Sequence, residues 1–148
     1  MSLRERITED MKTAMRGGDK VGLALIRMLQ AAIKQREVDE RIVLDDAQVT
    51  SVIEKMIKQR RESVVQFEAG GRADLVANEQ REIQQLEHYL PPKLSDAELD
   101  ALIQQAIVAT GAQSVKDMGK VMQIVKTQAA GRADMAIVGA RIKALLGG

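Results

Sequence analysis

The chain contains only two prolines, and they are adjacent, at Pro91 and Pro92. Proline cannot continue a helix, and it pushes the residue before it toward extended geometry. On both sides of this pair, apolar side chains recur at spacings of three and four residues, which is the period of an amphipathic helix. The pattern predicts an all-α protein with a boundary at the prolines. An N-terminal bundle of about four helices would occupy residues 1–90, and a smaller C-terminal three-helix domain would occupy residues 91–148.

The composition favours helices over sheet. Aromatic residues make up 1% of the 148 residues, so the core must be built from aliphatic side chains, which suit packed helices better than strands. Ser2 with Glu5, and Ser95 with Glu98, have the spacing of a capping box, in which each side chain bonds to the backbone N–H of the other residue. Further candidates for helix starts are Asp19, Asp45, Asp46 and Ser114.

One four-residue sequence occurs twice, at residues 71–74 and 131–134, where it reads Gly-Arg-Ala-Asp. A structural interpretation is that the glycine ends one helix and the aspartate caps the next, so that the fourth helix would start near Asp74. The functional alternative is that Arg132 lies exposed near a helix N-terminus and helps to bind a phosphate, although the negative charge of Asp134 opposes this.

The residue types argue against catalysis. The chain has no cysteine and one histidine, which excludes thiolate nucleophiles and makes a transition-metal site improbable, so we expect no metal and no cofactor. His88 is expected to be a partly buried structural residue. No serine lies in a Gly-x-Ser-x-Gly or Ser-x-x-Lys motif, and no phosphate-binding glycine loop occurs. We therefore assign no catalytic residue.

Positive charge is concentrated near the C-terminus. From residue 116 onward there are six basic and two acidic side chains, whereas residues 1–90 have 15 basic and 16 acidic ones. This excess predicts either a solvated helix face or a surface that binds the backbone of an RNA. Two aromatic residues cannot build a base-stacking platform, so the RNA contacts would be to phosphates. The candidate contacts are Lys116, Lys120, Lys126, Arg132, Arg141 and Lys143.

Two further features bear on this surface. Gly119 lies inside the expected sixth helix, where glycine costs about 1 kcal/mol relative to alanine, so something is expected to approach the backbone there: a crossing helix or an RNA backbone. A second basic segment, at residues 55–61, has acidic neighbours at Glu54 and Glu62, and a salt-bridged surface is the expected interpretation.

The first twelve residues have neither the apolar stretch of a signal peptide nor the acid-poor composition of a transit peptide. No stretch is apolar enough to span a membrane. With no cysteine, the sequence favours a cytoplasmic location.

Several spaced motifs resemble the bacterial YqeY family over essentially the whole chain. In the C-terminal half these are Asp117, Met118, Gly119, Lys120, Val121 and Met122, followed by Gly131, Arg132, Ala133 and Asp134, with Tyr89, Leu90 and Pro91 before them. In the N-terminal half they are residues 27–29 and 58–63, Phe67, residues 71–72, 74–75 and Glu79. The resemblance implies a two-part helical protein. Its C-terminal part is similar to the tail domain of GatB, the component of the tRNA-dependent amidotransferase whose tail helps to hold tRNA.

Taken together, the residues and the resemblance predict a non-catalytic tRNA-binding or amidotransferase-related accessory protein. An alternative is a protein–protein adaptor that docks on an amidotransferase or another translation protein through the N-terminal helices. The third possibility is a glutamine-dependent carbon–nitrogen ligase activity, which the resemblance implies by homology alone. It would need a nucleophile that the sequence does not reveal.

Overall fold

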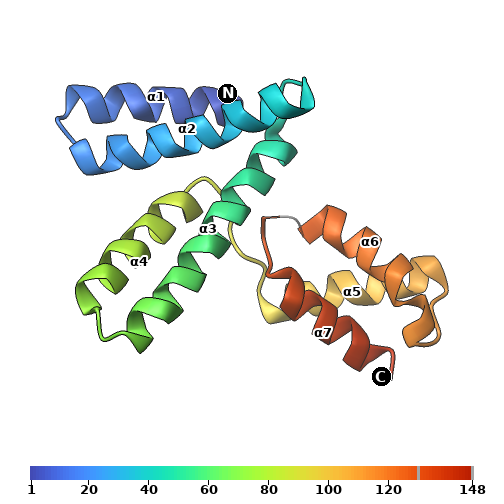
Figure 1. Ribbon diagram of the computed structural model, residues 1–148. Helices are drawn as coiled ribbons and strands as arrows, with labels where there is room; N and C mark the ends of the chain where they lie inside the picture. Colours follow the sequence, from blue (N-terminus) through green and yellow to red (C-terminus); the bar gives the residue numbers. More distant parts are fainter. Residues whose placement is uncertain (130, 148) are drawn as a thin grey trace. The chain divides into compact units, whose positions relative to one another are not determined.

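The computed structural model describes residues 1–129 and 131–147, and all regular structure within them is helical (Figure 1). The predicted all-α fold class is thereby confirmed. The chain forms two compact units, Met1–Leu90 (unit 1) and Pro91–Gly148 (unit 2), because most contacts between Cα atoms lie within one unit or the other. No helix within the described residues has both the length and the apolar character that crossing a bilayer requires.

Unit 1 consists of four helices in two antiparallel pairs (Figure 1). In chain order these are α1 (Leu3–Arg16), α2 (Lys20–Glu40), α3 (Asp46–Ala69) and α4 (Ala73–Glu87). Each helix contributes at least one side chain that is 1% exposed or less: Ile7, Leu29, Ile53 and Leu86. Since apolar burial is the main favourable term in folding, this shared aliphatic core holds the four helices together.

Unit 2 has a smaller core of the same kind. Its helices are α5 (Asp96–Thr110), the short 3-10 helix η1 (Val115–Asp117), α6 (Met118–Ala129) and α7 (Met135–Leu145). The fully buried side chains come from all three α-helices: Ile103, Val121, Val125, Val138 and Ile142. The expected sixth helix therefore begins with one 3-10 turn after Ser114, whose side chain makes no cap hydrogen bond.

The short-range start signals at Ser2, Asp19, Asp45 and Ser95 are confirmed. Ser2 and Glu5 form a capping box at the start of α1, and Ser95 and Glu98 form one at the start of α5. Asp19 caps α2 by accepting a hydrogen bond from the Gly22 N–H. These contacts join residues within one turn, so the spacing in the sequence is sufficient to predict them.

The repeated Gly-Arg-Ala-Asp sequence forms two different structures. In the second copy, the expectation is confirmed: Gly131 has a φ of 74°, and Asp134 caps α7 by accepting from the Ala136 N–H at 2.8 Å. In the first copy, the prediction that aspartate caps the helix is wrong. There α4 begins at Ala73, and the Asp74 carboxylate pairs with the Arg72 guanidinium, which lowers the pKa of Asp74.

Glu37 joins three segments of unit 1. Its carboxylate accepts hydrogen bonds from the Arg4 guanidinium on α1 and from the Leu44 N–H, at 2.9 Å, in the loop before α3. These two donors hold the pKa of Glu37 below its ordinary value of 4.5. One side chain near the end of α2 thus fixes both the α1–α2 pair and the turn into α3.

Ion pairs join the basic segment of α3 to α4. Arg60 is only 8% exposed, and its Nε donates to Glu82 Oε2 at 2.7 Å. Arg61 pairs with Glu87 at 2.9 Å. The sequence predicts a salt-bridged surface with nearby acids on the same helix, but the acids come from α4 and Arg60 lies in the interior. This burial follows from the close packing of α3 on α4.

We predict that Arg60→Met lowers the free energy of unfolding of unit 1 by roughly 2 to 3 kcal/mol, because it leaves Glu82 as a mostly buried acid without its cation. The double variant Arg60→Met with Glu82→Leu should recover most of that loss, since it removes both charges. Urea unfolding followed by the fluorescence of Tyr89, the only tyrosine, measures unit 1 alone. Lys58→Met, at an exposed position, is the control. An Arg60→Met loss as small as the control's would contradict this account.

Candidate nucleic-acid interface

The six candidate phosphate contacts all lie in unit 2. Lys116 is in η1, and Lys120 and Lys126 are on α6. Arg132 is in the loop between α6 and α7, and α7 carries the last two, Arg141 and Lys143. The structure separates these residues into two arginines with structural partners and four exposed lysines.

Arg141 is held by acidic residues of α5. Its guanidinium pairs with Asp100 at 2.7 Å and with Asp96 at 2.9 Å. These carboxylates raise the pKa of Arg141 above its ordinary value, with the hydrogen bond to Asp100 as the main cause. Two carboxylates already neutralise this charge, so Arg141 connects α7 to α5 and is a poor phosphate contact.

Arg132 is half-buried and connects the α6–α7 loop to the segment after the prolines. Its Nε donates to the Pro92 carbonyl at 3.3 Å, and its own carbonyl accepts from the Leu94 N–H at 2.8 Å. The adjacent Gly131 is buried in the left-handed conformation. The hydrogen bond to Pro92 occupies part of the Arg132 guanidinium, and the phosphate contact suggested for this residue stays a prediction.

The four lysines are exposed, and none forms an ion pair with a described acidic residue. Val121, Val125 and Ala129 turn one face of α6 into the core, which leaves Lys120 and Lys126 on the solvent-facing part of the helix. Lys120 is close enough to Asp117 to contribute to the lowered pKa of that carboxylate, whose main cause is the hydrogen bond from the Gln113 N–H. These four cations can reach an anion without breaking an existing ion pair.

Gly119 lies in the first turn of α6, between the side chains of Met118 and Lys120. It is exposed, and a Cβ added there would meet no atom within 4 Å. The expectation that a crossing helix packs against this glycine is wrong. The second alternative from the sequence, close approach by an external backbone, stays a prediction.

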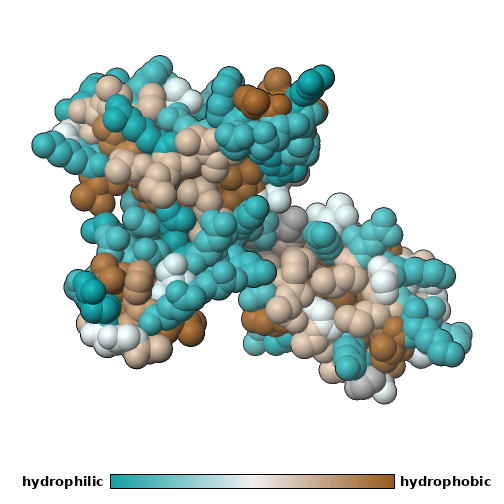
Figure 2. All heavy atoms as spheres, in the orientation of Figure 1, coloured by the Kyte–Doolittle hydropathy of each residue, from teal (hydrophilic) through white to brown (hydrophobic). Residues whose placement is uncertain are grey.

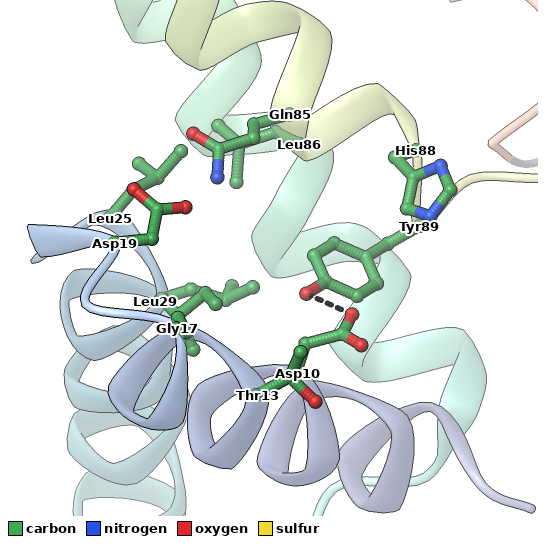
Figure 3. A pocket seen from close by; sticks show the side chains of 12 residues that line it. Asp10, Thr13, Gly17, Asp19, Leu25, Leu29, Gln85, Leu86, His88 and Tyr89 are labelled. Atoms are coloured by element: carbon green, nitrogen blue, oxygen red, sulfur yellow. Dashed lines mark hydrogen bonds between the residues drawn. The ribbon is translucent and has the colours of Figure 1, made fainter. Parts of the chain in front are cut away.

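Unit 1 contains a cavity that the sequence did not predict (Figure 3). Its lining comes from α1, α2 and the end of α4, and it includes His88 and Tyr89. His88 was expected to be partly buried, but its side chain is exposed, with the ring edge-on to Tyr89 at a centroid distance of 6.0 Å. The signal available in the sequence was the position of the only tyrosine next to the only histidine, directly before the prolines.

No three acidic or histidine side chains in the described part of the chain converge as metal ligands would.

A family model for YqeY-like proteins matches residues 4–146. Three similar proteins share the name "Altered inheritance of mitochondria protein 41, mitochondrial". The one from Pyrenophora tritici-repentis is 33% identical over 129 residues, which are 84% of this chain and 71% of that protein. Those from Lachancea thermotolerans and Eremothecium gossypii are 35% and 39% identical, over 66% and 64% of this chain. The chain spans about half, 54%, of the length of each of these two.

These relatives contradict the cytoplasmic location predicted from the sequence, because they are named as mitochondrial proteins. That prediction depended on the absence of cysteine and on the composition of the first residues. Neither observation decides the compartment, since a chain without cysteine is compatible with more than one reducing environment.

Alanine substitutions at Gly119 and Gly131 test the backbone conformation and the open space that the structure gives these two positions of unit 2. We predict that Gly119→Ala raises the free energy of unfolding of unit 2 by about 0.5 to 1 kcal/mol, because alanine favours a helix and the added Cβ meets open space. Gly131→Ala should lower it by about 1 kcal/mol or more, because φ is 74° there. Thermal unfolding followed by circular dichroism measures both. Destabilisation by Gly119→Ala would show that another segment packs against this position.

Proposed function

The chain belongs to the YqeY family, and from that premise we propose that it is a non-catalytic tRNA-binding accessory protein. In this proposal, unit 2 contacts the phosphate backbone of tRNA through Lys116, Lys120, Lys126 and Lys143. The observation that carries the proposal is a difference between the basic residues of unit 2: both arginines have structural partners, whereas these four lysines form no ion pair with a described residue.

An exposed lysine without an ion-pair partner is well suited to phosphate binding. Binding a phosphate releases counterions from the nucleic acid, and an unpaired cation loses no protein ion pair in the process. Arg141 would have to leave Asp96 and Asp100, which makes its contribution smaller. The contact set that we propose is therefore narrower than the six residues that the sequence alone suggested.

The exposure of Gly119 supports the same proposed tRNA-binding surface of unit 2. The absence of a side chain between Met118 and Lys120 leaves the backbone of the first turn of α6 open to solvent. A ligand backbone can approach a glycine more closely than any other residue. We propose that tRNA passes over this position, with Lys116 and Lys120 on its phosphates.

The aromatic residues do not provide an alternative mode of recognition. Tyr89 is buried in unit 1 and Phe67 is half-buried. Proteins that bind unpaired bases usually stack them on exposed aromatic rings. The proposed binding therefore depends on charge and on the shape of the folded RNA, and it should be sensitive to salt.

We predict that Lys120→Glu with Lys126→Glu weakens tRNA binding by roughly tenfold or more at low salt, because two attractive contacts become repulsive. The slope of log K against log salt should decrease in magnitude by about two. Fluorescence anisotropy of labelled tRNA, titrated with the full-length protein at several salt concentrations, measures both quantities.

The matched control is Lys55→Glu with Lys58→Glu, which makes the same change of net charge at exposed positions of α3 in unit 1. It should leave the affinity within about twofold. Equal losses in the two double variants would mean that net charge alone drives the binding. No saturable binding by the wild type at micromolar concentration would contradict the proposal.

A second candidate function, a protein–protein adaptor, is favoured by an exposed apolar patch in unit 1. Val38, Ile42 and Val43 lie where α2 turns into α3, and they are 60%, 38% and 80% exposed. Figure 2 shows a small group of apolar side chains at this corner, with hydrophilic side chains next to it. Exposed apolar patches of this kind mark binding sites for other proteins when they are contiguous.

For the adaptor function we predict that Val43→Glu abolishes a complex with purified tRNA-dependent amidotransferase, whereas Lys120→Glu with Lys126→Glu leaves it intact. A charge in an apolar contact is unfavourable, and Val43 is too exposed for its replacement to disturb the fold. Analytical ultracentrifugation of the mixed proteins measures the complex. An amidotransferase that sediments alone in the presence of the wild type would rule out this partner.

The third possibility, a carbon–nitrogen ligase activity, gains no support from the geometry. No cysteine exists, and no serine lines the cavity where the only histidine lies. We therefore base the proposed function on binding.

A further inference from the structure

The cavity in unit 1 has a volume of about 440 Å³. Small-molecule sites in proteins have volumes of roughly 300 to 1,000 Å³ and combine apolar walls with a few converging polar groups. The apolar part of this cavity consists of Leu25 and Leu29 from α2, Leu86 from α4, and Ala14 from α1. Figure 3 shows the polar side chains arranged around these leucines.

Asp10 is held in a defined position at one side of the cavity. Its Oδ2 accepts a hydrogen bond from the Tyr89 hydroxyl at 2.7 Å (Figure 3). Burial, together with the adjacent carboxylate of Asp10, raises the pKa of Tyr89, so the hydroxyl stays protonated and continues to donate. The other oxygen of Asp10 makes no hydrogen bond within the described part of the chain and can accept one from a ligand.

Asp19 and Gln85 lie together on the other side of the cavity. A Cβ added at Gly22 would be 2.3 Å from Asp19 Oδ2 and 3.1 Å from Gln85 Nε2, so both polar groups are next to the same point of α2. Asp19 uses Oδ1 to cap α2. Its Oδ2 and the whole Gln85 amide make no hydrogen bond with any described residue, and Figure 3 shows the Gln85 side chain projecting from α4 into the cavity.

The charge of the side chains that line the cavity determines whether an anion or a cation can bind there. Among the described residues, two carboxylates line the cavity and no lysine or arginine does. Arg6, which packs on Tyr89 from outside this lining, has its guanidinium 5.1 Å from the ring centroid and donates to the His88 carbonyl at 2.8 Å. An anion would therefore find two negative charges and no positive charge in the lining, whereas a cation would find acceptors on two sides.

We propose that this cavity is a binding site for a small aliphatic amine. The ammonium group is held by the Asp10 carboxylate, on the side of the cavity where Tyr89 fixes that carboxylate, and the hydrocarbon chain lies against Leu25, Leu29 and Leu86. An ammonium group donates hydrogen bonds and carries a positive charge, and hydrogen bonds between charged groups are stronger than neutral ones; Asp19 adds a second negative charge to the lining. The site belongs to unit 1 and does not depend on the tRNA-binding proposal for unit 2.

The test is a titration of full-length ¹⁵N-labelled protein with butylamine, followed by amide chemical shifts. We expect saturable shifts confined to the residues around the cavity, with a dissociation constant on the order of millimolar, as suits so small a ligand. Butanol and butyrate, at the same concentration and ionic strength, share the chain but lack the positive charge. Saturable binding of butanol as tight as that of butylamine would overturn the proposal, and so would an absence of saturable shifts with the amine.

Two variants locate the site. Asp10→Asn keeps the shape and can still accept from Tyr89, but it removes one charge, and it should weaken butylamine binding by roughly tenfold. Gln85→Ala, which removes no hydrogen bond of the folded protein, should weaken it less. Asp39→Asn, on α2 but outside the cavity lining, is the control and should bind as the wild type does. Wild-type affinity in Asp10→Asn would contradict the assignment.

Discussion

Burial of aliphatic side chains, with almost no aromatic support, holds each unit of this protein together. Fully buried isoleucine, leucine and valine residues from every α-helix meet in two separate cores, one in residues 1–90 and one in residues 91–148. Because these side chains must face inward, the polar face of each helix is directed to solvent. The positions of the exposed lysines on α6 and of the acidic residues around the unit 1 cavity follow from this constraint.

In both units, arginine and lysine have different roles. Arginines form most of the ion pairs of the described residues: Arg60 with Glu82, Arg61 with Glu87, and Arg141 with two aspartates of α5. The guanidinium is planar, weakly hydrated and rich in donors, so it suits buried and bidentate pairs, whereas the lysine ammonium is strongly hydrated. In unit 2, Lys116, Lys120, Lys126 and Lys143 are exposed and form no ion pair with a described acidic residue. The composition alone could not distinguish among the six basic residues that were candidate phosphate contacts.

The sequence was informative wherever a structure depends on neighbouring residues. The capping boxes at Ser2 and Ser95 and the helix break at Pro91 are determined within one turn, so spacing and residue type were enough to predict them. Arg60 shows where this fails, because Glu82 is on another helix and only the packing of α3 against α4 brings them together. The unit 1 cavity is a similar case: Asp10 and Tyr89 are far apart in the chain. The two copies of Gly-Arg-Ala-Asp differ for the same reason, since Arg132 has the Pro92 carbonyl as a partner and Arg72 has Asp74.

The central claim is that tRNA binds to the lysine-bearing surface of unit 2 and not to unit 1. The most direct measurement is a titration of ¹⁵N-labelled full-length protein with tRNA at low salt, which reports the amide shift of each residue. The account predicts that the largest shifts occur at residues 115–120, 126 and 143, with the α1–α4 amides unchanged. Shifts centred on unit 1, or none in unit 2 at saturating tRNA, would contradict it.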